Sequence, residues 1–265
     1  MVKNNFSSGY SDVNGLKMYY EIHGEGKPLV LIHGGGSTIQ TSFGNIIPLL
    51  AAKRKIIAVE LQAHGHTNDR DTPLTFQQDA DDVAMLLNNL KISKADFLGF
   101  SNGGQTTIEI ALRHPSMVNK LIIASAFYKR TAAPAQFWEG FDHVTLDMMP
   151  LALQEGFLKV NNSKEALLNS FNRDVERMRS FKGWTDEQMS SIKAPTLVIN
   201  GNHDVGSAEH AVEMHRIIPN AELLIVPGKH GAYLGAIEML EDGKWTQPYV
   251  ADIITTFLDQ DNLII

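Results

Sequence analysis

The pentapeptide Gly99-Phe100-Ser101-Asn102-Gly103 has the G-x-S-x-G pattern of a serine held in a sharp turn between a strand and a helix. It lies between an apolar run over residues 95–100 and a helix-like stretch over 105–113. Glycine on both sides of Ser101 suits such a turn, since larger residues would clash where the backbone is strained. The hydroxyl would then lie at a helix N-terminus, where free N–H groups favour negative charge on a substrate oxygen. A plain helix start with Ser101 as N-cap is the alternative interpretation.

A serine acts as a nucleophile only if a base lies within hydrogen-bonding reach and a third group orients that base. His230 follows a predicted strand over residues 221–226, and Asp204 follows a predicted strand over 195–200. The alternatives are a surface-loop histidine at one position and an Asx turn or helix N-cap at the other. The order serine, acid, histidine along the chain is typical of a parallel sheet with this serine turn. We therefore expect Ser101 as nucleophile, Asp204 as acid and His230 as base.

Acyl transfer also needs N–H donors that point to the oxygen of the tetrahedral intermediate. The run His33-Gly34-Gly35-Gly36-Ser37 follows a predicted core strand. We expect the backbone N–H of Gly35 and that of Asn102 to form this oxyanion hole, and Gly36 to contact the substrate. A phosphate-binding loop is the alternative, but the run fails G-x-G-x-x-G and no G-K-S/T follows it.

Two strand-like segments open the chain, over residues 16–22 and 29–33, and the glycines between them predict a hairpin. Short apolar strands then alternate with helices, which predicts a parallel sheet covered on both faces, with reactive groups at the carboxyl ends of the strands. Further strands are predicted over 55–60, 95–100, 120–126, 195–200 and 221–226, and helices over 42–52, 75–90, 105–113, 208–217 and 247–258.

The alternation stops over residues 129–190, where helical stretches follow one another without a strand. An insertion of about 60 residues without linker composition predicts a helical cap over a core formed by 1–128 and 191–265. Aromatic and methionine side chains in such a segment more often form its own core than a substrate wall, but a cap has to present some of them to the pocket. The candidates for substrate contact are Phe137, Trp138, Phe141, Met148 and Met149.

Composition limits the classes of function. The 265 residues, with 43% hydrophobic and 20% charged residues, fit one globular α/β domain with an insertion, and no apolar run approaches the roughly 20 residues of a membrane span. The start lacks the apolar stretch of a secretory signal, which predicts a cytoplasmic protein. The absence of cysteine excludes a thiolate nucleophile, a thiolate zinc site and disulfides. A net charge of −7 with scattered basic residues argues against nucleic acid and anionic membranes and favours a small-molecule substrate.

Taken together, these residues resemble the α/β-hydrolase superfamily, in particular its capped esterases, lactonases and cofactor-free haloperoxidases. The resemblance covers nearly the whole chain except the cap. It implies a mostly parallel eight-stranded sheet flanked by helices, the same three catalytic residues, and neither a metal nor an organic cofactor. The segments that carry it are Tyr19-Tyr20-Glu21, residues 28–34, residues 99–104, residues 201–204 and residues 227–230.

One segment departs from the family pattern. Relatives usually carry Asp and then Arg-Gly-His-Gly-Ser after the strand that here ends at Glu60, whereas this chain continues to Thr67 as Leu-Gln-Ala-His-Gly-His-Thr. We expect this loop to be structural, with His66 replacing no catalytic group. The pair His64 and His66 is also similar to the H-x-H-x-D-H of metallo-β-lactamase-like hydrolases, but the residues that follow do not match, so no metal is expected.

The sequence thus predicts a serine hydrolase that cleaves a small apolar ester, thioester or lactone through an acyl-enzyme on Ser101. Carbon–carbon bond hydrolysis and perhydrolase or haloperoxidase chemistry are alternatives on the same three residues. A ligand receptor with a retained triad and a non-catalytic homologue are alternatives from other classes. The oligomeric state is not predicted, and the apolar tail Leu263-Ile264-Ile265 fits either a contact or a frayed end.

Overall fold

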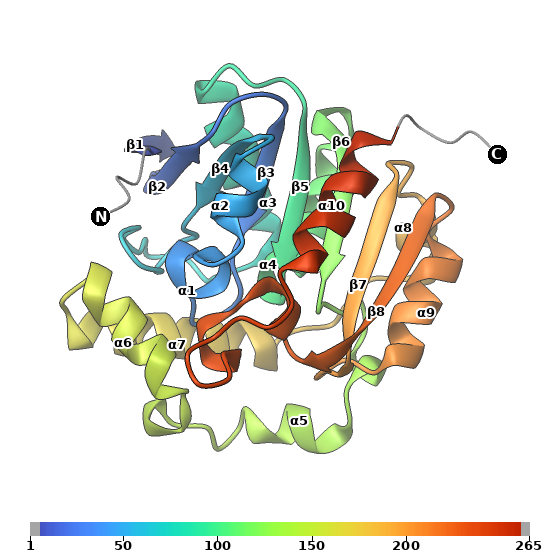
Figure 1. Ribbon diagram of the computed structural model, residues 1–265. Helices are drawn as coiled ribbons and strands as arrows, with labels where there is room; N and C mark the ends of the chain where they lie inside the picture. Colours follow the sequence, from blue (N-terminus) through green and yellow to red (C-terminus); the bar gives the residue numbers. More distant parts are fainter. Residues whose placement is uncertain (1–5, 261–265) are drawn as a thin grey trace.

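In the computed structural model, described here for residues 6–260, the centre of the molecule is one eight-stranded sheet with the strand order β1-β2-β4-β3-β5-β6-β7-β8 (Figure 1). β2 pairs antiparallel with both β1 and β4, and every other neighbouring pair in the sheet is parallel. The expected mostly parallel eight-stranded α/β sheet is thus confirmed. The strands are β1 Phe6–Val13, β2 Leu16–His23, β3 Pro28–Ile32, β4 Lys55–Val59, β5 Ala95–Phe100, β6 Val118–Ala124, β7 Thr196–His203 and β8 Ala221–Lys229. The tail over 263–265 lies outside the described residues.

The hairpin predicted for residues 16–22 and 29–33 is wrong. β2 and β3 do not pair, because β4 lies between them. The hairpin of the chain joins β1 to β2 through Asn14-Gly15, whose φ angles of 45° and 82° are those of a tight turn between antiparallel strands. The segment around Gly24 instead passes close to the chain that precedes β4: a Cβ there would lie 2.2 Å from the carbonyl oxygen of Ala51.

Helices cover both faces of the sheet, as predicted. One face packs against α3, α4 and α9, and the other against α1, α2 and α10; Figure 1 shows α2 and α10 in front of the sheet. The alternating side chains of β3 explain the two layers, since Val30 and Ile32 enter the first core and Leu29 and Leu31 the second. The core helices are α1 Ile39–Phe43, α2 Ile47–Ala51, α3 Phe76–Asn89, α4 Asn102–Arg113, α9 Ala208–Ile217 and α10 Tyr249–Asp259.

The single helix predicted over residues 42–52 is two short helices, α1 and α2. Thr38 begins α1 with a capping box, and the helix ends at Gly44. Pro48 then lies in the first turn of α2, where the missing N–H of proline costs no helical hydrogen bond. The end of α1 and the start of α2 therefore both lie within residues 42–52, whose apolar pattern predicted one continuous helix.

Residues 129–190 contribute no strand to the sheet and fold as helices α5 Ala135–Gly140, α6 Leu151–Val160, α7 Lys164–Arg179 and α8 Asp186–Ser190. Figure 1 shows α5, α6 and α7 beyond the carboxyl ends of the parallel strands. The chain returns to the core at Trp184, whose backbone N–H donates to the carbonyl of Tyr128 at 2.8 Å, and α8 contacts α9. Within residues 6–260, no helix combines the length and the apolar character needed to cross a membrane.

Helix α4 lies unusually close to the strands behind it. A Cβ on Gly103 would come within 2.0 Å of the carbonyl oxygen of Ile32 in β3, and one on Gly99 would come within 2.1 Å of the carbonyl oxygen of Gly103. Both contacts are with backbone, which a side-chain rotation cannot relieve. Glycine is therefore required at both positions of the pentapeptide if the turn between β5 and α4 is to keep its shape.

We predict that Gly103→Ala destabilises the fold by at least about 1–3 kcal/mol, because the added methyl group overlaps backbone atoms of β3. The free energy of unfolding in urea is the measurement. Gly140→Ala is the matched control, since Gly140 lies in α5 and a Cβ there would have no neighbour within 4 Å. The control is expected to be neutral or stabilising by up to about 1 kcal/mol. Equal unfolding energies for both variants would contradict the close approach.

Candidate active site

Ser101 lies between the end of β5 and the start of α4 in a strained backbone conformation, with φ 52° and ψ −123°. A non-glycine residue in such a region costs on the order of 1–3 kcal/mol and persists only when its surroundings hold it. Here the Ser101 N–H donates to the carbonyl of Ala124 in β6 at 2.9 Å. Ser101 occupies the N-cap position of α4, but its side chain makes no capping hydrogen bond. The hydroxyl is therefore free for another partner.

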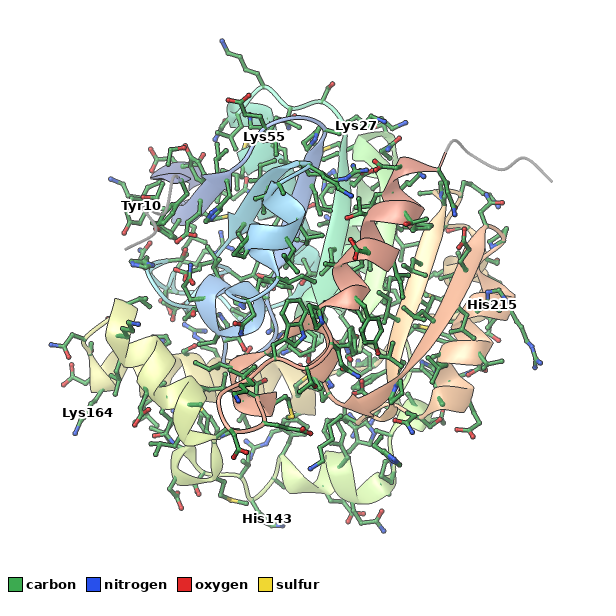
Figure 2. The ribbon with its side chains drawn as sticks, viewed as in Figure 1. Tyr10, Lys27, Lys55, His143, Lys164 and His215 are labelled. Atoms are coloured by element: carbon green, nitrogen blue, oxygen red, sulfur yellow. The ribbon has the colours of Figure 1, made fainter. Side chains whose placement is uncertain are left out.

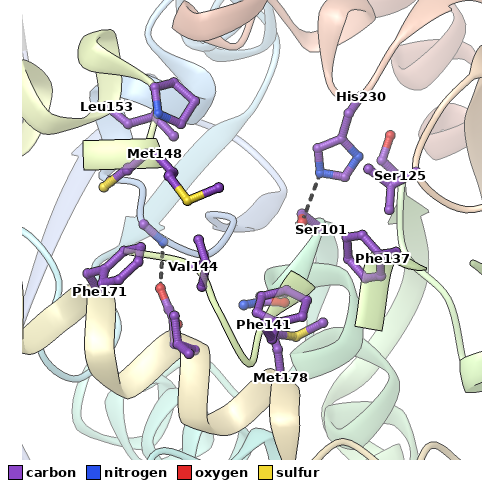
Figure 3. Close-up of a pocket in the computed structure, with 18 of the residues that line it drawn as sticks. Ser101, Ser125, Phe137, Phe141, Val144, Met148, Leu153, Phe171, Met178 and His230 are labelled. Atoms are coloured by element: carbon purple, nitrogen blue, oxygen red, sulfur yellow. Dashed lines mark hydrogen bonds between the residues drawn. The ribbon is translucent and has the colours of Figure 1, made fainter. Parts of the chain in front are cut away.

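That partner is His230, which directly follows β8. Its Nε2 lies 3.0 Å from Ser101 Oγ, and its Nδ1 lies 2.5 Å from Asp204 Oδ1 (the first contact is dashed in Figure 3). An ionised carboxylate only accepts hydrogen bonds, so Nδ1 carries the proton and the lone pair of Nε2 faces the serine hydroxyl. The three residues predicted from sequence thus form one hydrogen-bonded chain. They come from the ends of β5, β7 and β8.

The side chain of Asp204 is fully buried and accepts hydrogen bonds from several donors. Its Oδ2 accepts from the hydroxyl of Ser125 at 2.5 Å and from the backbone N–H of Gly201 at 3.1 Å, and its Oδ1 also accepts from the N–H of Val205. Burial alone would raise the pKa of Asp204, but His230 and these hydrogen bonds hold the pKa below its usual value. The N-cap of α9 is Ser207, so the capping alternative for Asp204 is excluded.

Ser125 is a site residue that the sequence analysis missed. It directly follows β6 with φ 49°, lines the cavity, and its hydroxyl lies 2.8 Å from that of Tyr233 besides donating to Asp204. Its position at the carboxyl end of a parallel strand was the available signal.

In the glycine loop after β3, residues 33–37, some backbone N–H groups donate to other residues and one has no acceptor. The Gly34 N–H donates to the hydroxyl of Ser42 at 3.3 Å, and the Gly36 N–H donates to Asp174 Oδ2 at 2.5 Å. Among the described residues, neither the N–H of Gly35 nor that of Asn102 has an acceptor. Gly35 and Asn102 both line the cavity with Ser101. The two predicted donors are thus available to a substrate oxygen.

A buried cluster of four charged side chains adjoins this loop. Asp174 of α7 accepts from His64 Nε2 at 2.8 Å and from Arg177, and Arg177 also donates to Asp79 of α3 at 2.8 Å. His64 Nδ1 lies 2.8 Å from the carbonyl oxygen of Gln62. Because both nitrogens of His64 face acceptors, both carry protons, and the side chain is an imidazolium buried beside the carboxylate.

The pKa shifts in this cluster follow from burial and charge. Burial opposes protonation of His64, but the charge and hydrogen bond of Asp174 outweigh burial and raise the pKa of His64. Burial likewise opposes ionisation of Asp174, yet the cations His64 and Arg177 hold the pKa of Asp174 well below its usual range. Burial raises the pKa of Asp79 to about 6 despite the neighbouring Arg177. The loop after β4 thus contacts, through His64, the Asp174 side chain that lines the cavity.

His33 stays neutral beside this cluster. Its Nε2 accepts from the backbone N–H of Leu61 at 3.0 Å, and its Nδ1 donates to the carbonyl of Gly34 at 2.7 Å. Burial, together with the nearby charge of His64, lowers the pKa of His33 to about 3. The neutral ring thus connects the glycine loop to the loop after β4.

The cavity in front of Ser101 has a volume of about 300 Å³ and is mainly apolar. Figure 3 shows Phe137, Phe141 and Met148 around the space between Ser101 and the helical segment. The predicted substrate contacts Gly36, Phe137, Phe141, Met148 and Met149 all line the cavity. Further lining residues that the sequence analysis did not name are Gln105, Phe127, Val144, Pro150, Leu153, Phe171, Val175, Met178 and Val205.

Trp138 does not line this cavity, and its prediction as a substrate contact is corrected. Its ring stacks on that of Phe181 with 5.6 Å between centroids, and its indole N–H donates to the carbonyl of Arg130 at 2.8 Å. Trp138 is buried in the larger of the hydrophobic clusters. Neighbouring positions on α5 face different directions, so Phe137 reaches the cavity and Trp138 packs behind it.

The histidines of the loop after β4 do not share a metal site. His64 binds Asp174, whereas His66 Nδ1 lies 2.9 Å from Glu60 Oε2. Within residues 6–260 there is no group of three or more His, Asp or Glu side chains arranged to hold a metal ion.

A family model described as the alpha/beta hydrolase fold matches residues 27–171, which is more than half of the chain. The chain belongs to the alpha/beta hydrolase fold family. This membership agrees with the eight-stranded sheet and with the resemblance noted from the sequence. Together with the hydrolase names of its relatives, it supports enzyme activity for this protein.

Relatives of this alpha/beta hydrolase carry hydrolase names. The human serine hydrolase BPHL is 29% identical over 239 residues, covering 84% of this chain and 79% of BPHL. The pyrrolizixenacetamide deacetylase of Xenorhabdus hominickii is 27% identical over 253 residues, covering 87% and 92%. Among solved structures, a serine hydrolase involved in carbazole degradation superposes with a TM-score of 0.79 at 21% identity, covering 96% and 98% of the two chains. At that identity the structural likeness supports the fold alone.

We predict that His64→Gln removes a pH-dependent part of the stability of this hydrolase. Since the pKa of His64 is raised in the folded chain, its protonation stabilises the fold fully below the ordinary value of 6.5, and this contribution is lost as pH rises through the raised pKa. The free energy of unfolding of the parent, relative to the variant, is therefore expected to fall as pH is raised above about 7. Urea unfolding at several pH values is the measurement.

His143→Gln is the control for this prediction. His143 is exposed on the outer side of the helical segment and is labelled at the edge of Figure 2, far from the end of the sheet where Lys27 and Lys55 lie. The control is expected to follow the pH dependence of the parent. A stability difference between the parent and His64→Gln that grows with rising pH would show that His64 is neutral in the folded chain.

Proposed function

We propose that this chain hydrolyses a small apolar carboxylic ester, thioester or lactone through an acyl-enzyme on Ser101. The observation that carries the proposal is the hydrogen-bonded chain Ser101–His230–Asp204 at the wall of an apolar cavity that also contains two N–H groups without acceptors. A nucleophile, its base and an oxyanion hole are the parts that acyl transfer requires.

In the first half-reaction, Ser101 Oγ attacks the carbonyl carbon while His230 Nε2 takes the hydroxyl proton. The negative charge on the carbonyl oxygen is stabilised by the backbone N–H of Gly35, in the loop after β3, and by that of Asn102, at the N-terminus of α4. Asp204 keeps the proton on Nδ1 and stabilises the imidazolium. When the intermediate collapses, the bond to the leaving group breaks and His230 gives its proton to the leaving alcohol or thiol.

In the second half-reaction, water attacks the acyl-enzyme while His230 again accepts a proton, and collapse releases the carboxylic acid and restores the Ser101 hydroxyl. The cavity supports a substrate of modest size, because about 300 Å³ is at the small end of ligand pockets. Its phenylalanine and methionine walls favour an apolar acyl or alcohol group. A lactone differs only in that the leaving oxygen stays attached to the acyl group.

The test is turnover of p-nitrophenyl acetate and butyrate by the parent and by Ser101→Ala. The parent is expected to turn over many times, and the variant to lose roughly 10⁴- to 10⁶-fold in kcat, since removal of the nucleophile leaves only binding and the oxyanion hole. Equal activity in both would contradict the role of Ser101. A stoichiometric burst without turnover would favour a ligand receptor.

Labelling by a fluorophosphonate and a comparison of substrate classes separate the remaining alternatives. Labelling at Ser101 in the parent is expected, and its absence would favour a non-catalytic homologue. A β-diketone cleaved faster than every ester would favour carbon–carbon bond hydrolysis. Peroxide-dependent halide oxidation exceeding ester hydrolysis would favour perhydrolase or haloperoxidase chemistry.

A further inference from the structure

Asp174 connects the helical segment 129–190 to the loop that carries one oxyanion donor. It lies on α7, yet its Oδ2 accepts the backbone N–H of Gly36 at 2.5 Å, next to the acceptor-free N–H of Gly35. A Cβ on Gly35 would come within 3.3 Å of Asp174 Oδ2 and within 2.5 Å of Asn102 Nδ2. The Asp174 carboxylate and the side chain of Asn102 therefore both pack against Gly35.

The carboxylate of Asp174 is itself fixed. Its Oδ2 accepts from His64 Nε2 at 2.8 Å and its Oδ1 accepts from Arg177. With the Gly36 contact, three of the roughly four acceptor positions of a carboxylate are used. Only 12% of the Asp174 side chain is exposed, so the hydrogen bond to Gly36 is shielded from competing water.

Without such a contact, the peptide plane between Gly35 and Gly36 could take many orientations. Glycine reaches many backbone conformations, and Gly36 has φ 64°, in the left-handed region. On one side of Gly35, the N–H of Gly34 is bound by Ser42; on the other, the N–H of Gly36 is bound by Asp174. Fixing both neighbours limits the directions in which the Gly35 N–H can point.

We propose that Asp174 is a positioning residue for the oxyanion hole, which it completes from α7 by holding the Gly36 N–H. The inference rests on the proposed function, because it concerns the donor that the acyl-transfer step uses. Donors stabilise the oxyanion only when they lie about 2.7–3.1 Å from it, and an error of about 1 Å can cost on the order of 10² in rate. Assembly of the hole thus depends on the contact between the Asp174 carboxylate and the Gly36 N–H.

A second contact of α7 allows this role to be separated from simple attachment of the helix. Arg173, next to Asp174, donates from Nε to Asp69 Oδ2 at 2.9 Å, and Asn169 donates to the same oxygen at 2.9 Å. Asp69 lies in the loop after β4, and among the described residues its carboxylate accepts from Gln62, Asn169 and Arg173 and from no residue of the glycine loop. Asp69→Asn therefore weakens the docking of α7 and leaves the acceptor of Gly36 in place.

The experiment compares Asp174→Asn with the matched control Asp69→Asn on a p-nitrophenyl ester. In Asp174→Asn only one side of the neutral amide can accept, so its NH₂ group faces either Gly36 and His64 or Arg177. In both orientations the Gly36 N–H loses its ionised acceptor, which weakens the hold on the loop. We expect kcat to fall roughly 10- to 100-fold with KM changed less than about threefold. The rate of fluorophosphonate inactivation, which also places an oxygen in the hole, is expected to fall by a similar factor. For Asp69→Asn both values are expected to stay within about twofold of the parent.

Equal losses in the two variants, or a change confined to KM, would overturn the positioning role and leave Asp174 as a docking residue. If Asp174→Asn does not fold, Asp174→Glu decides: it keeps the charge for His64 and Arg177 but moves the carboxylate off Gly36. A folded Asp174→Glu with lowered kcat supports the proposal, and one with full kcat overturns it.

A readout independent of turnover separates this inference from the proposed function. The Gly36 amide is expected to show a downfield proton shift and slow hydrogen exchange in the parent and in Asp69→Asn, and to lose both in Asp174→Asn. If the parent hydrolyses no ester, the proposed function fails while the amide signal still reports the contact. If the amide signal is the same in all three proteins, the positioning role fails whatever the activity.

Discussion

The close approach of α4 to the strands behind it is the constraint on which the candidate site depends. Gly99 and Gly103 allow backbone to lie against backbone, and only that spacing places Ser101 in its strained turn above the sheet. The cost of the turn is offset by burial of the two hydrophobic cores on the sheet faces. The positions of the hydroxyl, of the N-terminus of α4 and of the Asn102 N–H all follow from it.

Two buried carboxylates near the site, Asp204 and Asp174, belong to two separate hydrogen-bond networks. Asp204 is oriented by donors from β6 and β7 and serves only His230, whereas Asp174 is oriented by two cations and serves the glycine loop. Each carboxylate is kept ionised by its own partners, so neither depends on the other. This separation allows two carboxylates, of which only Asp174 lines the cavity, to lie near a reaction that itself develops negative charge.

The sequence was sufficient for the strands β2 to β8, though not for β1, and for the residues at their ends, because both depend on local patterns. Ser101, Asp204 and His230 each follow an apolar run, and parallel strands bring such positions to one edge. The predicted hairpin is wrong because Asn14-Gly15 is a stronger turn signal than Gly24, and β4 pairs with β2 in the place expected for β3. Asp174 and His64 could not be paired, since they are far apart in sequence and only the docking of α7 brings them together. The spacing of Asp174 and Arg177 on one helix face was the only local hint.

The dependence of the glycine loop on Asp174 has a consequence for modular exchange among relatives. If the helical segment of another alpha/beta hydrolase were grafted onto this core, Gly36 would lose its acceptor and His64 would become an unpaired buried cation. A transplanted segment would therefore have to carry an acid and an arginine three residues apart, in register with the loop after β4. Substrate range and catalytic framework are thus coupled in this chain, and a chimera designed only to reshape the cavity would disturb both.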